Sequence, residues 1–238
     1  MFIPIGDDNS GRLRAPVIVV TLVLINAFVW YLQLTLGEPF TYGFAVVPFE
    51  LTRGVDLAVS TQIQLPGGIE RIPQFPGPSP IWLTIISSMF MHGSWGHILG
   101  NMLYLIIFGD QIEDRLGHLR FLLFYLICGV AASIAHIAID PASTIPCLGA
   151  SGAIAGVLGA YWVSHPRNRV KVIWFRPLQI THIPASVVLG GWIVIQLVSQ
   201  ISVIGGAGSG IAYMAHIGGF VAGIALLKLF PRADTIVR

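Results

Sequence analysis

The chain has 238 residues, of which 55% are hydrophobic and only 10% are charged, and its formal net charge is +2. A soluble domain usually has about 25% charged residues, so the composition indicates a membrane protein, and the small net charge gives no reason to expect a nucleic-acid partner. The two cysteines, Cys128 and Cys147, have neither a disulfide framework nor metal-ligand spacing, and we expect both to be small apolar residues.

Residues 1–14 form a short polar lead. The first apolar segment runs from Ala15 to Leu36, which is longer than a signal-peptide core of roughly 7–15 residues, and no small-x-small cleavage site follows it. We therefore expect a retained span. Residues 37–80 mix Pro and Gly with Phe, Ile and Leu, which predicts a long outer loop that lies partly in the membrane interface.

Further spans are expected at 81–108, 119–139, 151–163, 183–203 and 211–230. A polar turn is expected at 109–117, a basic loop after residue 163, a glycine-rich turn at 205–210 and a short tail at 231–238. The sequence thus predicts an all-α membrane protein with six spans in a single domain over residues 15–230.

The basic residues predict how this bundle lies in the membrane, because loops on the cytoplasmic side carry an excess of Lys and Arg. With a cytoplasmic N-terminus, only Arg53 and Arg71 of the 13 basic residues fall outside. The others fall inside: Arg12, Arg14, Arg115, Arg120, Arg167, Arg169, Lys171, Arg176, Lys228, Arg232 and Arg238. The N-terminus and the tail are therefore expected in the cytoplasm. Since no segment of transit-peptide type precedes the first span, a bacterial inner membrane is the expected location.

The fourth apolar segment is unusually short, since it begins at Ser151 and ends before the polar run from Ser164 to Arg169. A helix of about 14 residues is about 21 Å long, whereas the hydrocarbon layer is roughly 30 Å thick. If its basic end lies at one surface, Ser151 must lie inside the membrane. A hydroxyl at that depth requires cover by protein or access to water, which predicts a wet cavity with a serine in its wall.

Polar side chains in the second span are functional candidates, because polar groups are costly within a bilayer. His97 and Asn101 are four residues apart and share one helix face, whereas His92 lies about 140° away from His97. Two histidines at this spacing make a poor metal site. For His97 and Asn101 a purely structural role in helix packing stays open, and for His92 we expect a structural hydrogen bond into the preceding loop.

The sixth span is predicted to pack closely against the fourth. Gly219 and Gly223 form a small-xxx-small pair, and Gly152 and Gly156 form another in the fourth span. Such pairs let two helix backbones approach each other. His216 borders the Gly219 face, so this packing would bring its imidazole next to Ser151.

A serine next to a histidine can act as a nucleophile with its base, which neither residue can do alone. A serine hydroxyl becomes a nucleophile when a base accepts its proton, and histidine is the usual base near neutral pH. His97, Asn101 and the backbone amide of Ser151 could stabilise the resulting oxyanion. Because the carboxylates fall outside the spans, the sequence predicts a Ser–His dyad rather than a triad.

These motifs resemble the rhomboid family of intramembrane serine proteases over nearly the whole chain. The matching residues are Gly149-x-Ser151-Gly152, His92-x4-His97-x3-Asn101, Ala215-His216-x2-Gly219-x3-Gly223 and the Glu113-x-Arg115 pair before the third span. The resemblance implies a six-helix bundle in which Ser151 is the nucleophile and His216 the base. It also implies an oxyanion hole of His97, Asn101 and the Ser151 amide, with structural support from His92, Gly149, Gly152, Gly219 and Gly223.

The resemblance further implies transmembrane proteins as substrates, access from the lipid between the second and fifth spans, and no cofactor or metal. Two positions depart from the family pattern: Ala155 stands where an aromatic residue often supports the catalytic imidazole, and Trp82-Leu83 replaces a Trp-Arg pair. The alternatives are a catalytically inactive relative that binds membrane spans and, from a different class, a transporter or channel. The substrate and the oligomeric state are not predicted.

Overall fold

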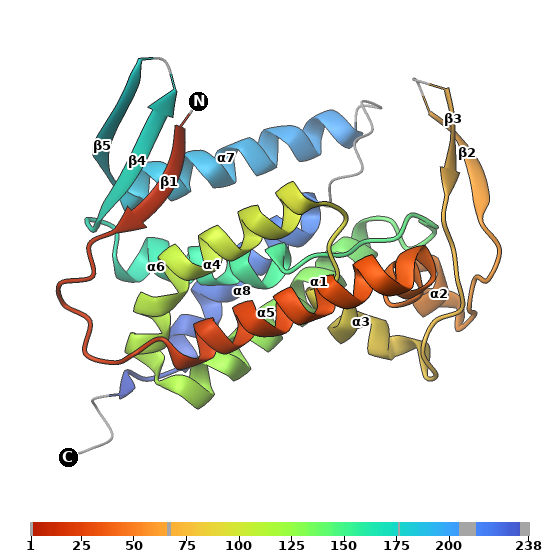
Figure 1. The fold of residues 1–238 in the computed structure, drawn as a ribbon, viewed down its shortest axis with the longest axis horizontal. Coiled ribbons are helices and arrows are strands. Elements are labelled where there is room, and N and C mark those ends of the chain that lie inside the picture. The colour runs from red at the N-terminus through yellow and green to blue at the C-terminus, as the bar shows by residue number, and fades with distance from the viewer. Residues whose placement is uncertain (1, 66–67, 176, 205–212, 234–238) are drawn as a thin grey trace.

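The computed structural model describes residues 2–65, 68–175, 177–204 and 213–233, and most of them are helical (Figure 1). Three helices in these ranges are long and apolar enough to cross a membrane, over Val17–Gly43, His118–Ile139 and Ala185–Ser202. The predicted helical membrane bundle with a short fourth helix is thereby confirmed. Its main helices are α1 (Val17–Gly43), α4 (Trp95–Leu116), α5 (His118–Ile139), α6 (Ser151–Ser164), α7 (Ala185–Ile204) and α8 (Tyr213–Leu229).

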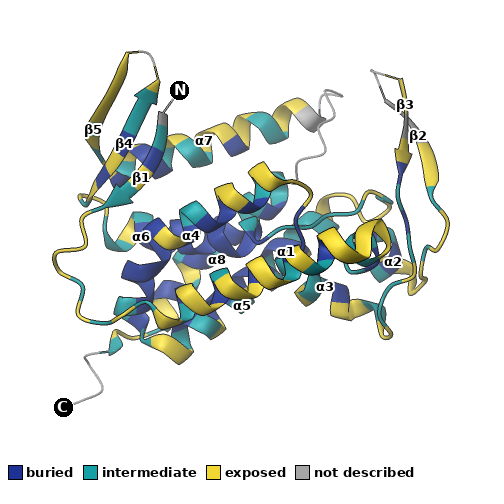
Figure 2. Cartoon of the chain, in the orientation of Figure 1, coloured by how far each residue is buried: buried dark blue, intermediate teal, exposed yellow. Residues whose placement is uncertain are grey.

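The short helix α6 lies at the centre of the bundle, and α1 and α7 lie at its periphery (Figure 2). Every residue of α6 from Gly152 to Tyr161 is buried, as expected for a helix that is apolar on all sides. The outer helices instead expose large apolar side chains, such as Phe28 of α1 and Ile195 of α7. An exposed apolar surface of this extent suits contact with lipid.

The second predicted span, residues 81–108, is not one continuous helix. Residues Ile81–Phe90 form three short pieces, including α3 (Thr84–Ser87), and α4 begins only at Trp95. The Ser94 side chain accepts a hydrogen bond from the His97 amide at 3.1 Å. This is an N-cap interaction that favours a new helix start at this point.

The polar turn expected at 109–117 is also wrong, because α4 continues to Leu116. The polar side chains in this stretch contact the N-terminal lead. The carboxylate of Glu113 accepts hydrogen bonds from the amides of Ile18 and Val19 at 2.8 Å each, and Arg12 pairs with Asp110 at 2.7 Å. The buried carboxylates of α4 are therefore satisfied by the beginning of the chain, including the first amides of α1.

Two small sheets were not predicted. Strands β1 (Phe2–Asp7), β4 (Arg169–Phe175) and β5 (Leu178–Pro184) form an antiparallel sheet in the order β1-β4-β5. In β4, Val170 and Val172 are buried while Arg169 and Lys171 are exposed, which is the period-two pattern of a strand. The expected basic loop thus contains a hairpin, and the polar lead supplies its third strand. The second sheet is the hairpin β2 (Thr61–Leu65) and β3 (Gly68–Ile72).

The long outer segment has more structure than the sequence predicts. Helix α1 continues past Leu36 to Gly43 through a kink at Gly37, where φ is 75°, and α2 (Pro48–Arg53) follows. This segment binds the stretch before α6. Val46 and Cys147 exchange backbone hydrogen bonds of 2.9 and 2.8 Å, and Gln74 donates to the Thr144 carbonyl at 2.7 Å.

The outer segment therefore fixes the path of the chain into Ser151. The glycine-rich turn at 205–210, the beginning of the sixth span at 211 and the end of the tail lie outside the described residues.

Candidate active site

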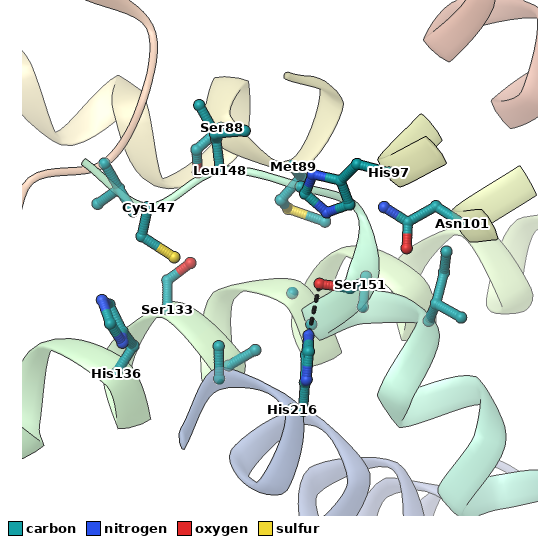
Figure 3. A pocket seen from close by; sticks show the side chains of 18 of the residues that line it. Ser88, Met89, His97, Asn101, Ser133, His136, Cys147, Leu148, Ser151 and His216 are labelled. Atoms are coloured by element: carbon teal, nitrogen blue, oxygen red, sulfur yellow. Dashed lines mark hydrogen bonds between the residues drawn. The ribbon is translucent and has the colours of Figure 1, made fainter. Parts of the chain in front are cut away.

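Ser151 and His216 meet at the wall of a cavity (Figure 3). Ser151 is the first residue of α6 and His216 lies in the first turn of α8. The imidazole Nε2 lies 2.7 Å from the Ser151 hydroxyl oxygen. This is hydrogen-bonding distance, as required when a base accepts a proton from a serine.

Close packing of α6 against α8 makes this contact possible. A Cβ atom added to Gly219 would overlap the carbonyl oxygen of Gly152, and one added to Gly223 would overlap the carbonyl oxygen of Gly156. Glycine at both positions of α8 lets the two backbones touch. The structure thus brings together the glycine pairs that the sequence singled out.

Helix α7 supplies two neighbours of His216 that the sequence analysis did not single out. The Gln196 side-chain oxygen lies 2.7 Å from Nδ1 of His216, and the Trp192 ring centre lies 5.7 Å from the imidazole centre. Trp192 and Gln196 are four residues apart and therefore share one face of α7. A glutamine within an apolar span was the available signal, because buried polar groups in a membrane usually have a partner.

Trp192 stands in for the aromatic residue that is missing at Ala155. Ala155 is fully buried within α6, and the aromatic ring against the imidazole comes from Trp192 of α7 instead. Because an amide oxygen can only accept, Gln196 requires the proton of a neutral His216 to be on Nδ1. This tautomer leaves the Nε2 lone pair facing the Ser151 hydroxyl.

His97 and Asn101 line the same cavity as Ser151 and approach it from α4 (Figure 3). The Asn101 side-chain nitrogen is buried and has no hydrogen-bond partner among the described residues. The Gly93 amide donates to Nδ1 of His97 at 3.4 Å, so that in the neutral ring the proton is on Nε2. Two side-chain donors are thus available beside the serine.

Gly149 determines how closely His97 approaches the beginning of α6. Its φ of 130° lies in a region that residues with a Cβ rarely adopt, and an added Cβ would lie 2.8 Å from both Cε1 and Nε2 of His97. The Gly149 amide also donates to the Ser88 carbonyl at 2.8 Å. A side chain at this position would displace His97 and the chain leading into Ser151.

His92 lies behind His97 and is almost fully buried. Its backbone exchanges two hydrogen bonds with Gln33 of α1, at 3.0 and 2.8 Å. Its ring packs edge-on against His97, with 5.1 Å between ring centres. The bonds to α1 thus come from its backbone, and its ring supports His97.

The cavity has a volume of about 960 Å³ and is bounded by residues of α4, α5, α6, α7 and α8 and by the segment before α6. Its size is at the upper end of the usual range for a binding pocket. On the side away from Asn101 it is lined by Ser133 and His136 of α5 and by Cys147 (Figure 3). The serine therefore borders a space that could hold several residues of a peptide.

Comparison with known proteins finds rhomboid proteins in both a family model and individual relatives. The family model of the Rhomboid domain matches residues 80–233. The chain is 28% identical over 169 residues to Rhomboid-like protein 11, chloroplastic, of Arabidopsis thaliana, a match that covers 65% of this chain and 56% of that protein. It is 39% identical over 79 residues to Rhomboid protease GluP of Bacillus subtilis, covering 33% and 15%. It is 34% identical over 80 residues to Putative rhomboid protease YdcA of the same bacterium, covering 34% and 40%.

The chain thus spans about half or less of the length of these relatives. The matched region contains Ser151, His216, His97 and Asn101 and all the main helices except α1. The matched domain covers well over half of the chain, and its apolar helices are those of a multi-pass integral membrane protein: the chain belongs to the rhomboid family.

Proposed function

We propose that this protein is an intramembrane serine endopeptidase that cleaves transmembrane segments of other proteins. The observation that supports this most directly is the 2.7 Å contact between the Ser151 hydroxyl and Nε2 of His216. Support also comes from the name of a relative, Rhomboid protease GluP. Other relatives are named only as rhomboid-like, so the alternative is an inactive relative that binds membrane spans through the same cavity.

In the proposed reaction the Ser151 oxygen attacks the carbonyl carbon of the scissile peptide bond, and its proton passes to Nε2 of His216. The donors of His97 and Asn101 and the Ser151 amide, at the N-terminus of α6, stabilise the oxyanion. His216 then gives the proton to the leaving amine, and an acyl-enzyme remains. Water, deprotonated by His216, hydrolyses the ester and regenerates Ser151.

The substrate helix must unwind before this can happen, because a helix holds its carbonyl groups in hydrogen bonds. We therefore expect small or helix-breaking residues near the cleaved bond. Lateral access would lie between α4 and α7, which contribute Asn101 and Gln196 to opposite sides of the dyad. A cytoplasmic N-terminus and a bacterial inner membrane stay predictions, since the relatives include chloroplast and mitochondrial proteins.

Covalent labelling tests the proposed function without knowledge of the natural substrate. A fluorophosphonate reacts preferentially with an activated serine, so the purified protein in detergent should be labelled with the adduct on the peptide that contains Ser151. A model transmembrane substrate should slow the labelling by competition. Absence of labelling at Ser151 in protein that remains folded would favour the inactive, span-binding alternative.

Gln196 acts in this mechanism as a positioning residue for His216. Replacing Gln196 with methionine keeps the length of the side chain but removes the acceptor for the Nδ1 proton. We expect kcat to fall about 10- to 100-fold, because the bond to Gln196 strengthens when His216 becomes positively charged. KM should change by less than about twofold, because Gln196 does not line the cavity that would hold the substrate. Gln196→Glu restores an acceptor and should recover part of kcat.

The tautomer of His216 provides a second test of the role of Gln196, and it can be measured by nitrogen NMR of protein with isotope-labelled histidines. The parent should show the neutral His216 ring with its proton on Nδ1, and Gln196→Met should lose this preference. The matched control is Ser202→Ala on the same helix, since the Ser202 hydroxyl donates only to the Val198 carbonyl of its own helix. An unchanged kcat and an unchanged tautomer in Gln196→Met would remove Gln196 from the mechanism and leave the dyad intact.

A further inference from the structure

A second hollow lies at the opposite end of α6 from Ser151. It has a volume of about 520 Å³ and lies between the N-terminal lead, the end of α4, the turn after α6 and the chain after α8. Figure 1 shows these segments together at one end of the bundle. The lining includes Ser164, His165 and three arginines, Arg115, Arg167 and Arg232.

The three arginines come from three separate parts of the sequence. Arg115 lies in the last turn of α4, Arg167 in the turn after α6 and Arg232 beyond the end of α8. Burial lowers the pKa of His165 at the hollow, and the positive charges of Arg115 and Arg232 lower it further, whereas the charge of Asp114 has the opposite effect. A partly buried guanidinium without an acidic partner raises the free energy of the fold unless an anion neutralises it.

The carboxylates that border the hollow accept hydrogen bonds from backbone amides. Asp114 accepts hydrogen bonds from the amides of Leu13 and Arg14 at 3.0 and 2.6 Å, and Asp8 accepts one from the Ser10 amide at 3.0 Å. In the part of the chain that the structure describes, Arg115 and Arg167 form no ion pair. The Nε atom of Arg115 is moreover buried and has no hydrogen-bond acceptor among the described residues.

The helix ends nearby do not fully explain this arrangement. A cation near a helix C-terminus is favourable, and both α4 and α6 end at the hollow. A buried donor without an acceptor nevertheless costs free energy, and the Nε of Arg115 is such a donor. A guanidinium presents its donors as a planar fork that matches the oxygens of a phosphate.

We propose that this hollow is a binding site for a phosphate-bearing anion, with Arg115 as its central ligand and Arg167 and Arg232 beside it. The anion would link the end of α4, the turn after α6 and the chain after α8. Two sources share this chemistry: the headgroup of an anionic phospholipid, which lies at the level of such juxtamembrane basic residues, and a free phosphate compound. The site is separate from the Ser151 cavity, so the proposal does not depend on proteolytic activity.

The test measures binding to the purified full-length protein in a neutral detergent. One arm titrates phosphatidylglycerol in mixed micelles against phosphatidylcholine with the same chains, and the other titrates inorganic phosphate at constant ionic strength. A ligand that binds only the folded state should raise Tm in a saturable way, by several degrees at a concentration about 100 times Kd. Saturation by phosphatidylglycerol alone identifies a lipid headgroup, and saturation by inorganic phosphate identifies a free phosphate site.

Three variants decide whether the hollow is responsible. Arg115→Gln and, in the exposed turn, Arg167→Gln should each raise Kd by about tenfold or more, because each removes a charge-assisted hydrogen bond. Arg167→Gln keeps the test valid if Arg115→Gln fails to fold. Lys171→Gln is the matched control: it removes one charge from an exposed position of β4 outside the hollow, and Kd should change by less than about twofold.

Two results would overturn the proposal. One is that neither phosphatidylglycerol nor inorganic phosphate produces a saturable shift of Tm. The other is that Lys171→Gln weakens binding as much as Arg167→Gln, which would mean that the basic surface as a whole, rather than the hollow, attracts the anion.

Discussion

Ser151→Ala is expected to reduce cleavage of a model transmembrane substrate by at least about 10³-fold, to the background of the assay. The replacement removes the attacking oxygen but leaves the backbone amide and the other oxyanion donors in place. Cleavage is measured in proteoliposomes by the appearance of the two product fragments. Because the Ser151 side chain is small and lies at a cavity wall, Tm should stay close to that of the parent protein.

Ser202→Ala again provides the matched control, with the same chemical change on α7, away from the dyad. It should retain full cleavage. Cleavage by Ser151→Ala at the parent rate would contradict the assignment of Ser151, whereas an inactive parent protein that still binds the substrate would favour the span-binding alternative.

Gly219→Val is expected to abolish both activity and native packing. The new side chain would overlap the carbonyl oxygen of Gly152, and overpacking of a dense core typically costs about 1–3 kcal/mol even when neighbouring side chains can adjust. Here the obstacle is backbone, so α8 must move away from α6. His216, three residues before Gly219 on α8, would then lose its contact with Ser151. Tm and fluorophosphonate labelling at Ser151 should both decrease.

The control for this prediction is Gly191→Ala on α7, where an added Cβ would have no heavy atom within 4 Å. Alanine favours a helix more than glycine does, so Tm should be unchanged or slightly higher and labelling should be preserved. If Gly219→Val labelled at the parent rate, close contact of α6 and α8 would not be what brings the dyad together.

The sequence predicted the contact between Ser151 and His216 because the signals for it can be read from short segments of the chain. A short apolar segment, a serine at its beginning and two matching glycine pairs are visible without any knowledge of the fold, and they place His216 beside Ser151. The contacts of Gln196 and Trp192 with His216 were not predicted, because they depend on how α7 is rotated toward α8. Gln196 within residues 183–203 indicated a buried polar partner, but nothing in the sequence specifies which partner it contacts.

The errors in the predicted fold also arise from contacts between distant parts of the chain. The composition of residues 109–117 is typical of a polar turn, yet these residues continue a helix. Arg12 pairs with Asp110, and the amides of Ile18 and Val19 donate to Glu113. Partners about 100 residues away cannot be inferred from local composition. Strand β4 could have been predicted from its alternation, but its pairing with the polar lead could not.

The burial of α6 from Gly152 to Tyr161 has a consequence for how this family can diversify. A buried stretch of helix cannot acquire new recognition residues unless its neighbours change at the same time, since each added atom must displace one already present. If the proposed function holds, selectivity for different substrates is therefore expected to change on the surrounding helices, while the helix that carries Ser151 stays nearly constant in size and shape.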